Sequence, residues 1–236
     1  MKSKLIVALD VDTIKEAENL LKKLHKEVEI FKIGPQLFTR YGPRIIKTVH
    51  KFKRGVFLDL KLHDIPNTVA NTATQITRLK VFMFTVHTQG GSEMMRKAQG
   101  AAAEEAGKMG IKPPVILGVT VLSSFNRKDL RELNVSGAVD EQVARLVRLA
   151  RKAGIGGVVL SPKEAAGARK IAGRDFIIVC PGIRPAGYKK DDQKRTAGPK
   201  KAIESGADYI VVGRPVIKAA RPGEAAREIL AEIKGD

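Results

Sequence analysis

Residues 55–64 read Gly55-Val56-Phe57-Leu58-Asp59-Leu60-Lys61-Leu62-His63-Asp64, an apolar run that ends among three charged residues. The apolar part predicts a buried strand. Because side chains alternate along a strand, Asp59 and Lys61 are expected on one face, with Leu58 and Leu60 on the other. Burying a charge costs several kcal/mol unless partners compensate, so a sequence selected for stability alone would place apolar residues here. The cluster therefore indicates a functional site at the end of this strand.

Similar apolar runs recur along the 236 residues and alternate with amphipathic segments. The expected strands are Leu5–Leu9, Val28–Ile33, Val56–Leu60, Val81–Val86, Val115–Thr120, Gly157–Leu160, Phe176–Cys180 and Tyr209–Val212. The expected helices are Ile14–Leu24, Pro35–Phe52, Thr68–Arg78, Ser92–Met109, Asp140–Ala153, Pro162–Ile171, Pro199–Glu204 and Gly223–Ile233. Eight such units predict an α/β fold, a (β/α)₈ TIM barrel forming one domain over residues 1–236. A doubly wound open sheet is the alternative, but no G-x-G-x-x-G motif follows the first strand.

A long connection at residues 182–198 interrupts this alternation between the seventh strand and the helix that begins at Pro199. Loops of this length without secondary structure of their own are commonly functional. This loop also follows a strand on the face where barrel enzymes carry their chemistry. We therefore expect it to be a mobile lid over the site, with a neutral insertion as the alternative.

The composition is strongly basic, with a formal net charge of +18 and a pI near 10.1. Such a charge suits either a nucleic-acid-binding surface or an enzyme that acts on an anionic metabolite. The basic residues are spread over the expected helices, only 5% of residues are aromatic and Trp is absent, so surfaces for stacking bases are scarce. The composition favours a small-molecule enzyme and no nucleic-acid partner.

The sequence also constrains where the protein works. No run approaches the roughly 20 apolar residues of a membrane span, and the N-terminal residues lack the pattern of a signal peptide. The single cysteine, Cys180, excludes an internal disulfide and lies in an apolar run. We expect Cys180 to be a buried residue that packs like a small apolar side chain rather than a nucleophile. We also expect a cytoplasmic protein without a membrane partner.

Charged residues also mark the ends of the first two strands, where Asp10 follows the first and Lys32 lies in the second. In a barrel these ends converge with Asp59 and Lys61 at one mouth. Opposite charges about 4 Å apart attract by roughly 4 kcal/mol at an effective dielectric constant of 20, so the network is expected to stay ionised. A lysine between carboxylates keeps its proton and suits a general acid rather than a base. A structural ion-pair network is the alternative.

The eighth strand ends in Val212-Gly213-Arg214-Pro215. Backbone N–H groups at a glycine and a guanidinium suit a phosphate, and the loops after strands seven and eight are the usual phosphate site of barrels. Arg184, within Pro181–Pro185, is expected at the same rim. These residues predict a phosphate site, although a turn with a surface arginine is the alternative.

Two further polar residues follow strands. His87 ends the fourth strand and is expected to be a hydrogen-bonded structural residue, with a role as ligand or base as the alternative. Ser123 follows the fifth strand and suits either a cap or a substrate contact. The sequence has neither the His and Cys spacing typical of a metal site nor a nucleotide-binding P-loop, and we expect no metal.

Together these segments resemble the orotidine 5′-phosphate decarboxylase family. The matching segments run in order along nearly the whole chain: Leu9-Asp10, Phe31–Gly34, Asp59–Thr68, Val119–Ser124, Pro181–Pro185, Gln193 and Val212–Pro215. The D-x-K-x-x-D block followed by I-P-N-T is highly specific. The resemblance implies a homodimeric barrel that decarboxylates orotidine 5′-monophosphate to UMP, the last step of de novo pyrimidine biosynthesis, without cofactor or metal.

The resemblance also implies a role for individual residues. The catalytic residues would be Lys61, Asp59, Asp64 and Lys32, with Lys61 protonating C6 as carbon dioxide leaves. Asp64 and Thr68 would complete the partner subunit's site. Ser123 would contact the pyrimidine edge, with Thr120 as a second candidate. The full substrate-binding set would be Asp10, Lys32, Asp59, Lys61, Asp64, Ile65, Thr68, Thr120, Ser123, Arg184, Gln193, Gly213 and Arg214.

The nearest alternative is a sister sugar-phosphate enzyme, such as a hexulose-phosphate synthase or a ketogulonate-phosphate decarboxylase. Those enzymes share the D-x-K-x-x-D signature but use magnesium, with an acidic residue at the position of Lys32. A lysine there would oppose a divalent cation. Lys32 therefore favours the metal-free decarboxylase.

Overall fold

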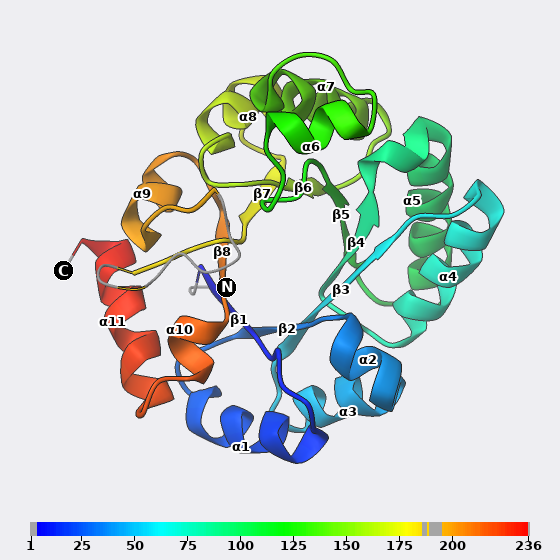
Figure 1. The fold of residues 1–236 in the computed structure, drawn as a ribbon. Helices are drawn as coiled ribbons and strands as arrows, with labels where there is room; N and C mark the ends of the chain where they lie inside the picture. The colour runs from blue at the N-terminus through cyan, green and yellow to red at the C-terminus, as the bar shows by residue number, and fades with distance from the viewer. Residues whose placement is uncertain (1–3, 186–187, 189–194, 236) are drawn as a thin grey trace.

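The computed structural model describes residues 4–185, 188 and 195–235, and its eight strands close into a parallel barrel in chain order (Figure 1). The last strand pairs with the first, in register Leu5 with Ile210 and Val7 with Val212. The strands are β1 (Leu5–Ala8), β2 (Ile30–Ile33), β3 (Gly55–Leu62), β4 (Met83–His87), β5 (Val115–Val119), β6 (Gly157–Val159), β7 (Ile177–Cys180) and β8 (Tyr209–Val212). The predicted (β/α)₈ barrel is confirmed.

Helices surround this barrel on its outer face, as the view along the barrel shows (Figure 1). They are α1 (Ile14–Leu24), α2 (Pro35–Tyr41), α3 (Pro43–Lys51), α4 (Pro66–Arg78), η1 (Thr88–Gly90, a 3₁₀ turn), α5 (Gly91–Lys108), α6 (Arg127–Glu132), α7 (Val139–Lys152), α8 (Ala165–Ala172), α9 (Pro199–Glu204), α10 (Arg214–Ile217) and α11 (Pro222–Lys234). Among the helices in the described part of the chain, none is long and apolar enough to cross a membrane.

The single helix expected over Pro35–Phe52 is wrong, because the chain forms α2 and α3 there. Gly42 separates them with a φ of +51°, a conformation that glycine adopts at little cost. Pro43 then begins α3, where its missing N–H is not needed. The Gly-Pro pair therefore ends one helix and starts the next.

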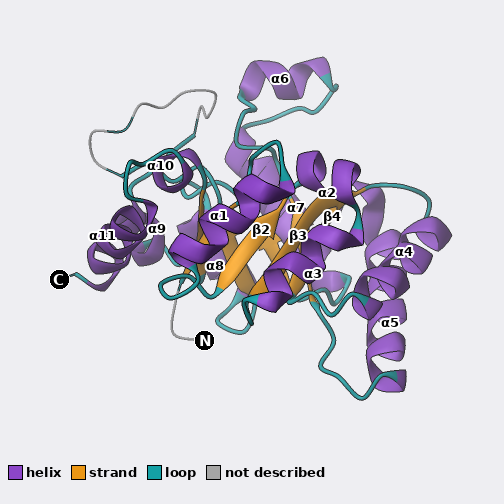
Figure 2. Cartoon of the chain, turned by 90° about the horizontal axis from the view of Figure 1, so that it is seen from below, coloured by secondary structure: helices purple, strands orange, loops and turns teal. Residues whose placement is uncertain are grey.

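Helix α6 was not expected, although its start has a clear sequence signal. The Asn126 side chain accepts hydrogen bonds from the N–H groups of Lys128 and Asp129, and the Asp129 carboxylate accepts from the Asn126 N–H at 2.6 Å. This reciprocal arrangement is a capping box. Figure 2 shows α6 standing away from the barrel at one end of the molecule.

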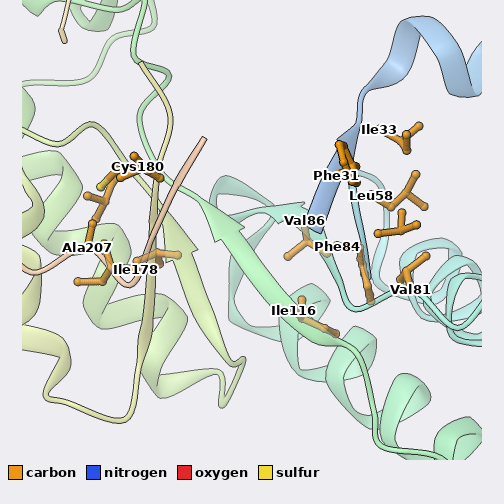
Figure 3. Packing of buried hydrophobic residues seen from close by; sticks show 14 of the residues in the cluster. Phe31, Ile33, Leu58, Val81, Phe84, Val86, Ile116, Ile178, Cys180 and Ala207 are labelled. Atoms are coloured by element: carbon orange, nitrogen blue, oxygen red, sulfur yellow. The ribbon is translucent and has the colours of Figure 1, made fainter. Parts of the chain in front are cut away.

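Two apolar layers hold the barrel together. The larger lies between the sheet and the helices and includes Phe31, Leu58 and Phe84, all fully buried (Figure 3). Cys180 belongs to this layer, as expected, and its burial raises the pKa of its thiol. The smaller layer fills the barrel interior and contains Ile6, Ala8, Ile30, Phe57, Met83, Leu117, Val179 and Val211. This inner layer closes the barrel below the site.

Candidate active site

A cavity of about 300 Å³ opens at the carboxyl ends of the strands, directly above the inner apolar layer. Its floor is formed by Ala8, Phe57 and Val211, which are members of that layer. Cavities of this size and mixed lining are typical of small-molecule sites. Eight of the predicted site residues line it: Asp10, Lys32, Asp59, Lys61, Ser123, Arg184, Gly213 and Arg214.

Four of these side chains form a row of alternating charge. The Lys61 Nζ lies 2.9 Å from Asp59 Oδ2, and the Lys32 Nζ lies 3.7 Å from the same oxygen. Lys32 also lies 3.1 Å from Asp10 Oδ1. Each lysine therefore has a carboxylate partner, and Asp59 lies between two ammonium groups. Among the described residues, no cluster of three or more His, Cys, Asp or Glu side chains could hold a metal ion.

Thr85 of β4 holds two members of this row in place by hydrogen bonds, and it was not among the residues predicted for the site. Its buried hydroxyl donates a hydrogen bond to Asp59 Oδ1 at 3.0 Å and accepts one from the Lys61 N–H at 2.8 Å. One hydroxyl thus fixes the carboxylate and the backbone of its lysine neighbour. A polar residue inside the apolar run Val81–Val86 was the available signal.

Lys61 has an unusual backbone conformation, with a φ of +52°. The register between β3 and β4 shifts between Leu58 and Leu62, so the end of β3 does not follow regular alternation. Non-glycine residues in this left-handed region cost roughly 1–3 kcal/mol and cluster at functional sites. The 2.9 Å contact between Lys61 and Asp59 therefore forms at an irregular part of the strand, which side-chain alternation alone does not describe.

The predicted phosphate residues lie at the ends of β7 and β8. Gly213 and Arg214 lead from β8 into α10, and both line the cavity. The Arg184 N–H donates to the Ala197 carbonyl at 2.9 Å, next to an isolated parallel bridge between Ile183 and Ala197. Gln193 and the middle of the predicted lid at 182–198 lie outside the described residues, so the lid stays a prediction.

Four predicted residues do not line the cavity of a single chain. Asp64, Ile65 and Thr68 are exposed at the start of α4, and the Asp64 carboxylate accepts a hydrogen bond from the Ile65 N–H. The buried Thr120 hydroxyl instead donates to the Val159 carbonyl at 3.0 Å. Of the two candidates for the pyrimidine contact, the structure places Ser123 at the cavity wall.

His87 is hydrogen-bonded and stacked, as a structural histidine would be. Its ring lies 5.3 Å from the His63 ring, and its Nδ1 accepts from the Gln89 N–H at 3.4 Å at the start of η1. Burial lowers the pKa of His87 to about 4, helped by nearby His63 and Lys61, so the ring is neutral at pH 7.

Comparisons with known proteins place the chain in a family. Residues 3–229 match the model of the orotidine 5′-phosphate decarboxylase / HUMPS family. The chain is 46% identical over 234 residues to an orotidine 5′-phosphate decarboxylase of Moorella thermoacetica, covering 99% of this chain and 93% of that protein. A crystal structure of orotidine 5′-phosphate decarboxylase from Lactobacillus acidophilus superposes with a TM-score of 0.85 at 38% identity, covering 97% of this chain and 98% of that one. The chain therefore belongs to the orotidine 5′-phosphate decarboxylase / HUMPS family.

Proposed function

We propose that this chain is a cytoplasmic enzyme of pyrimidine biosynthesis that decarboxylates orotidine 5′-monophosphate to UMP, with Lys61 as the proton donor. The observation that carries the proposal is the row Asp10, Lys32, Asp59 and Lys61 over an apolar floor. The family and its relatives agree with this reaction.

The proposed chemistry needs an ammonium group at a fixed position. When the bond between C6 and the carboxyl group breaks, the electron pair stays on C6, which has no neighbouring electron sink. A preorganised positive charge in a site shielded from water stabilises such a developing anion. The Lys61 ammonium, held 2.9 Å from Asp59, then gives its proton to C6 and regains one from solvent. Asp59 thus positions the donor and lies beside the departing carboxylate.

The remaining cavity residues provide contacts for the rest of the nucleotide. We assign Asp10 and Lys32 to the ribose and Ser123 to the pyrimidine edge. Arg184, Gly213 and Arg214, with Gln193, would hold the phosphate. Binding energy from the phosphate, far from the reacting carbon, can be used to align the base for reaction.

We further propose that the enzyme is a homodimer in which each cavity is completed by the partner subunit's Asp64 and Thr68. Support comes from the start of α4, where Asp64 and Thr68 are exposed beside Ile65, a large apolar side chain that is 66% exposed. A second subunit would bury Ile65 and bring both polar residues to a cavity they do not reach within one chain.

Lys32 argues against a magnesium-dependent sugar-phosphate reaction. Its ammonium lies 3.1 Å from Asp10 and 3.7 Å from Asp59, so it already neutralises the two carboxylates that a divalent cation would use. A second positive ion beside it would be repelled.

Turnover in chelator tests the proposed reaction. We expect the purified protein to convert orotidine 5′-monophosphate to UMP and carbon dioxide in excess EDTA, because every charge in the proposed mechanism is supplied by side chains. In D₂O the UMP should carry deuterium at C6. Absence of turnover, or turnover that returns only with added magnesium, would contradict the proposal.

Replacing Arg214 with alanine should raise KM for orotidine 5′-monophosphate by roughly 10- to 100-fold, since a charge-assisted contact to phosphate is worth about 1.5–3 kcal/mol. Orotidine, which lacks the phosphate, should be affected far less. Arg221→Ala is the matched control, because the Arg221 side chain is 77% exposed and pairs with Glu224 at the start of α11. Equal losses for both substrates would contradict the assignment of Arg214.

A further inference from the structure

Arg195 is a buried cation that the proposed reaction does not use. The residue is 8% exposed, and its Nη1 lies 2.6 Å from Oε1 of the equally buried Glu164. Its Nη2 donates to the carbonyls of Val121 at 3.1 Å and Leu122 at 2.8 Å. One guanidinium therefore connects the segment before α9 to the loops that follow β5 and β6.

The backbone of the same segment is held as well. The Ser161 hydroxyl, just after β6, donates to the Arg195 carbonyl at 3.2 Å. Two residues further on, the Ala197 carbonyl accepts from the Arg184 N–H at 2.9 Å. Residues 195–197 thus touch three of the connections that form the cavity rim.

These contacts lie directly behind two walls of the cavity. Val121 and Leu122 line the cavity and are followed by Ser123, the assigned pyrimidine contact. Arg184, which follows β7 and is hydrogen-bonded to Ala197, lines the cavity from another side. A displacement of residues 195–197 would therefore move Ser123 and Arg184 relative to each other.

Stability alone does not explain a buried pair of this kind. Replacing a buried ion pair with well-packed apolar residues is often neutral or stabilising. Here, within the described part of the chain, Arg195 Nε and Glu164 Oε2 are buried without a hydrogen-bond partner, which adds to the cost of burial. What the pair provides is a fixed geometry: the planar guanidinium can bond Glu164 and two carbonyls only in one arrangement.

We propose that Arg195 is a positioning residue. It fixes the segment Val121–Ser123, here called the Ser123 wall, relative to the segment that carries Arg184, here called the Arg184 wall, so that binding the phosphate aligns the base. The assignment of the two walls to base and phosphate rests on the proposed function. Because the role is alignment, its loss should be largest for a substrate that engages both walls.

The test compares substrates with and without the phosphate. In the double variant Arg195→Met/Glu164→Leu, which removes both buried charges, we expect the ratio of kcat/KM for orotidine 5′-monophosphate to kcat/KM for orotidine to fall about 10- to 100-fold, as small misplacements can cost on this order. The ratio of UMP to uridine affinity should fall in parallel. Arg195→Lys keeps the buried charges but loses the planar guanidinium, so a smaller fall in both ratios is expected. If the double variant does not fold, the Arg195→Lys result tests the proposal in its place.

Arg169→Met is the matched control for loss of stability. Arg169 of α8 lies 2.6 Å from Asp208 and donates to the carbonyls of Phe176 and Gly206, all near the amino ends of β7 and β8. Its loss should lower the free energy of unfolding and leave both ratios unchanged.

The outcomes separate the two proposals. A folded Arg195 variant with ratios within about twofold of wild type would overturn the role of Arg195, as would an equal fall in Arg169→Met. A wild-type chain that binds UMP but does not decarboxylate orotidine 5′-monophosphate would refute the proposed function instead, because the affinity ratio still tests Arg195.

Discussion

Lys61→Ala is expected to lower kcat for orotidine 5′-monophosphate by about 10⁴-fold or more, since it removes a general acid worth roughly 10²–10⁴ and an electrostatic stabiliser worth roughly 10²–10³. The dissociation constant of UMP should change by less than about tenfold, because the lysine acts mainly in the transition state. Asp59 keeps Lys32 as a partner at 3.7 Å, so the cavity should persist. Single-turnover kinetics and UMP titration measure the two quantities.

Lys53→Ala is a control with the same backbone conformation. Lys53 also has a left-handed φ, +55°, but is exposed in the turn before β3 and does not line the cavity. It reports the cost of alanine at a positive φ without the loss of a reacting ammonium. If Lys61→Ala retained kcat within about tenfold of the Lys53→Ala value, Lys61 would not be the proton donor.

Mixing Asp59→Asn chains with Asp64→Asn chains should restore activity that neither variant shows alone. If each site uses Asp59 from one chain and the partner subunit's Asp64, every heterodimer has one intact site. Random association of equal amounts gives about half heterodimers, so roughly a quarter of wild-type activity is expected. Differently tagged chains allow the heterodimer to be purified and assayed.

A second mixture controls for nonspecific recovery. Asp59 and Lys61 contact each other within one chain, so a heterodimer of Asp59→Asn and Lys61→Ala has no intact site and should stay inactive. Purified Asp59→Asn/Asp64→Asn heterodimers with no more activity than this control would show that Asp64 does not complete the partner's site.

Much of the barrel could be predicted from the sequence because its signals are local. The apolar runs at Leu5–Leu9 and Tyr209–Val212 each became a strand within one residue of the expected bounds. Since parallel strands of a barrel end at one mouth, Asp10, Lys32 and Asp59 could be placed together without coordinates.

Features that depend on contacts between distant segments could not be predicted. The left-handed backbone of Lys61 is stabilised by Thr85, 24 residues away. Arg195 contacts Val121 and Leu122 more than 70 positions earlier in the chain. A pattern of residue types contains no information on such pairings. The break between α2 and α3 was missed for another reason. Gly42-Pro43 is a local signal, but the helical periodicity on either side of it obscured the break.

The position of the Lys61 ammonium relative to the base is the central claim, and a crystal structure of the protein with bound UMP measures it most directly. We expect the Lys61 Nζ about 3–3.5 Å from C6 of the pyrimidine ring, the separation of groups poised to react. A bound UMP whose C6 lies beyond about 6 Å from that nitrogen, with Lys61 still paired to Asp59, would contradict proton transfer from Lys61.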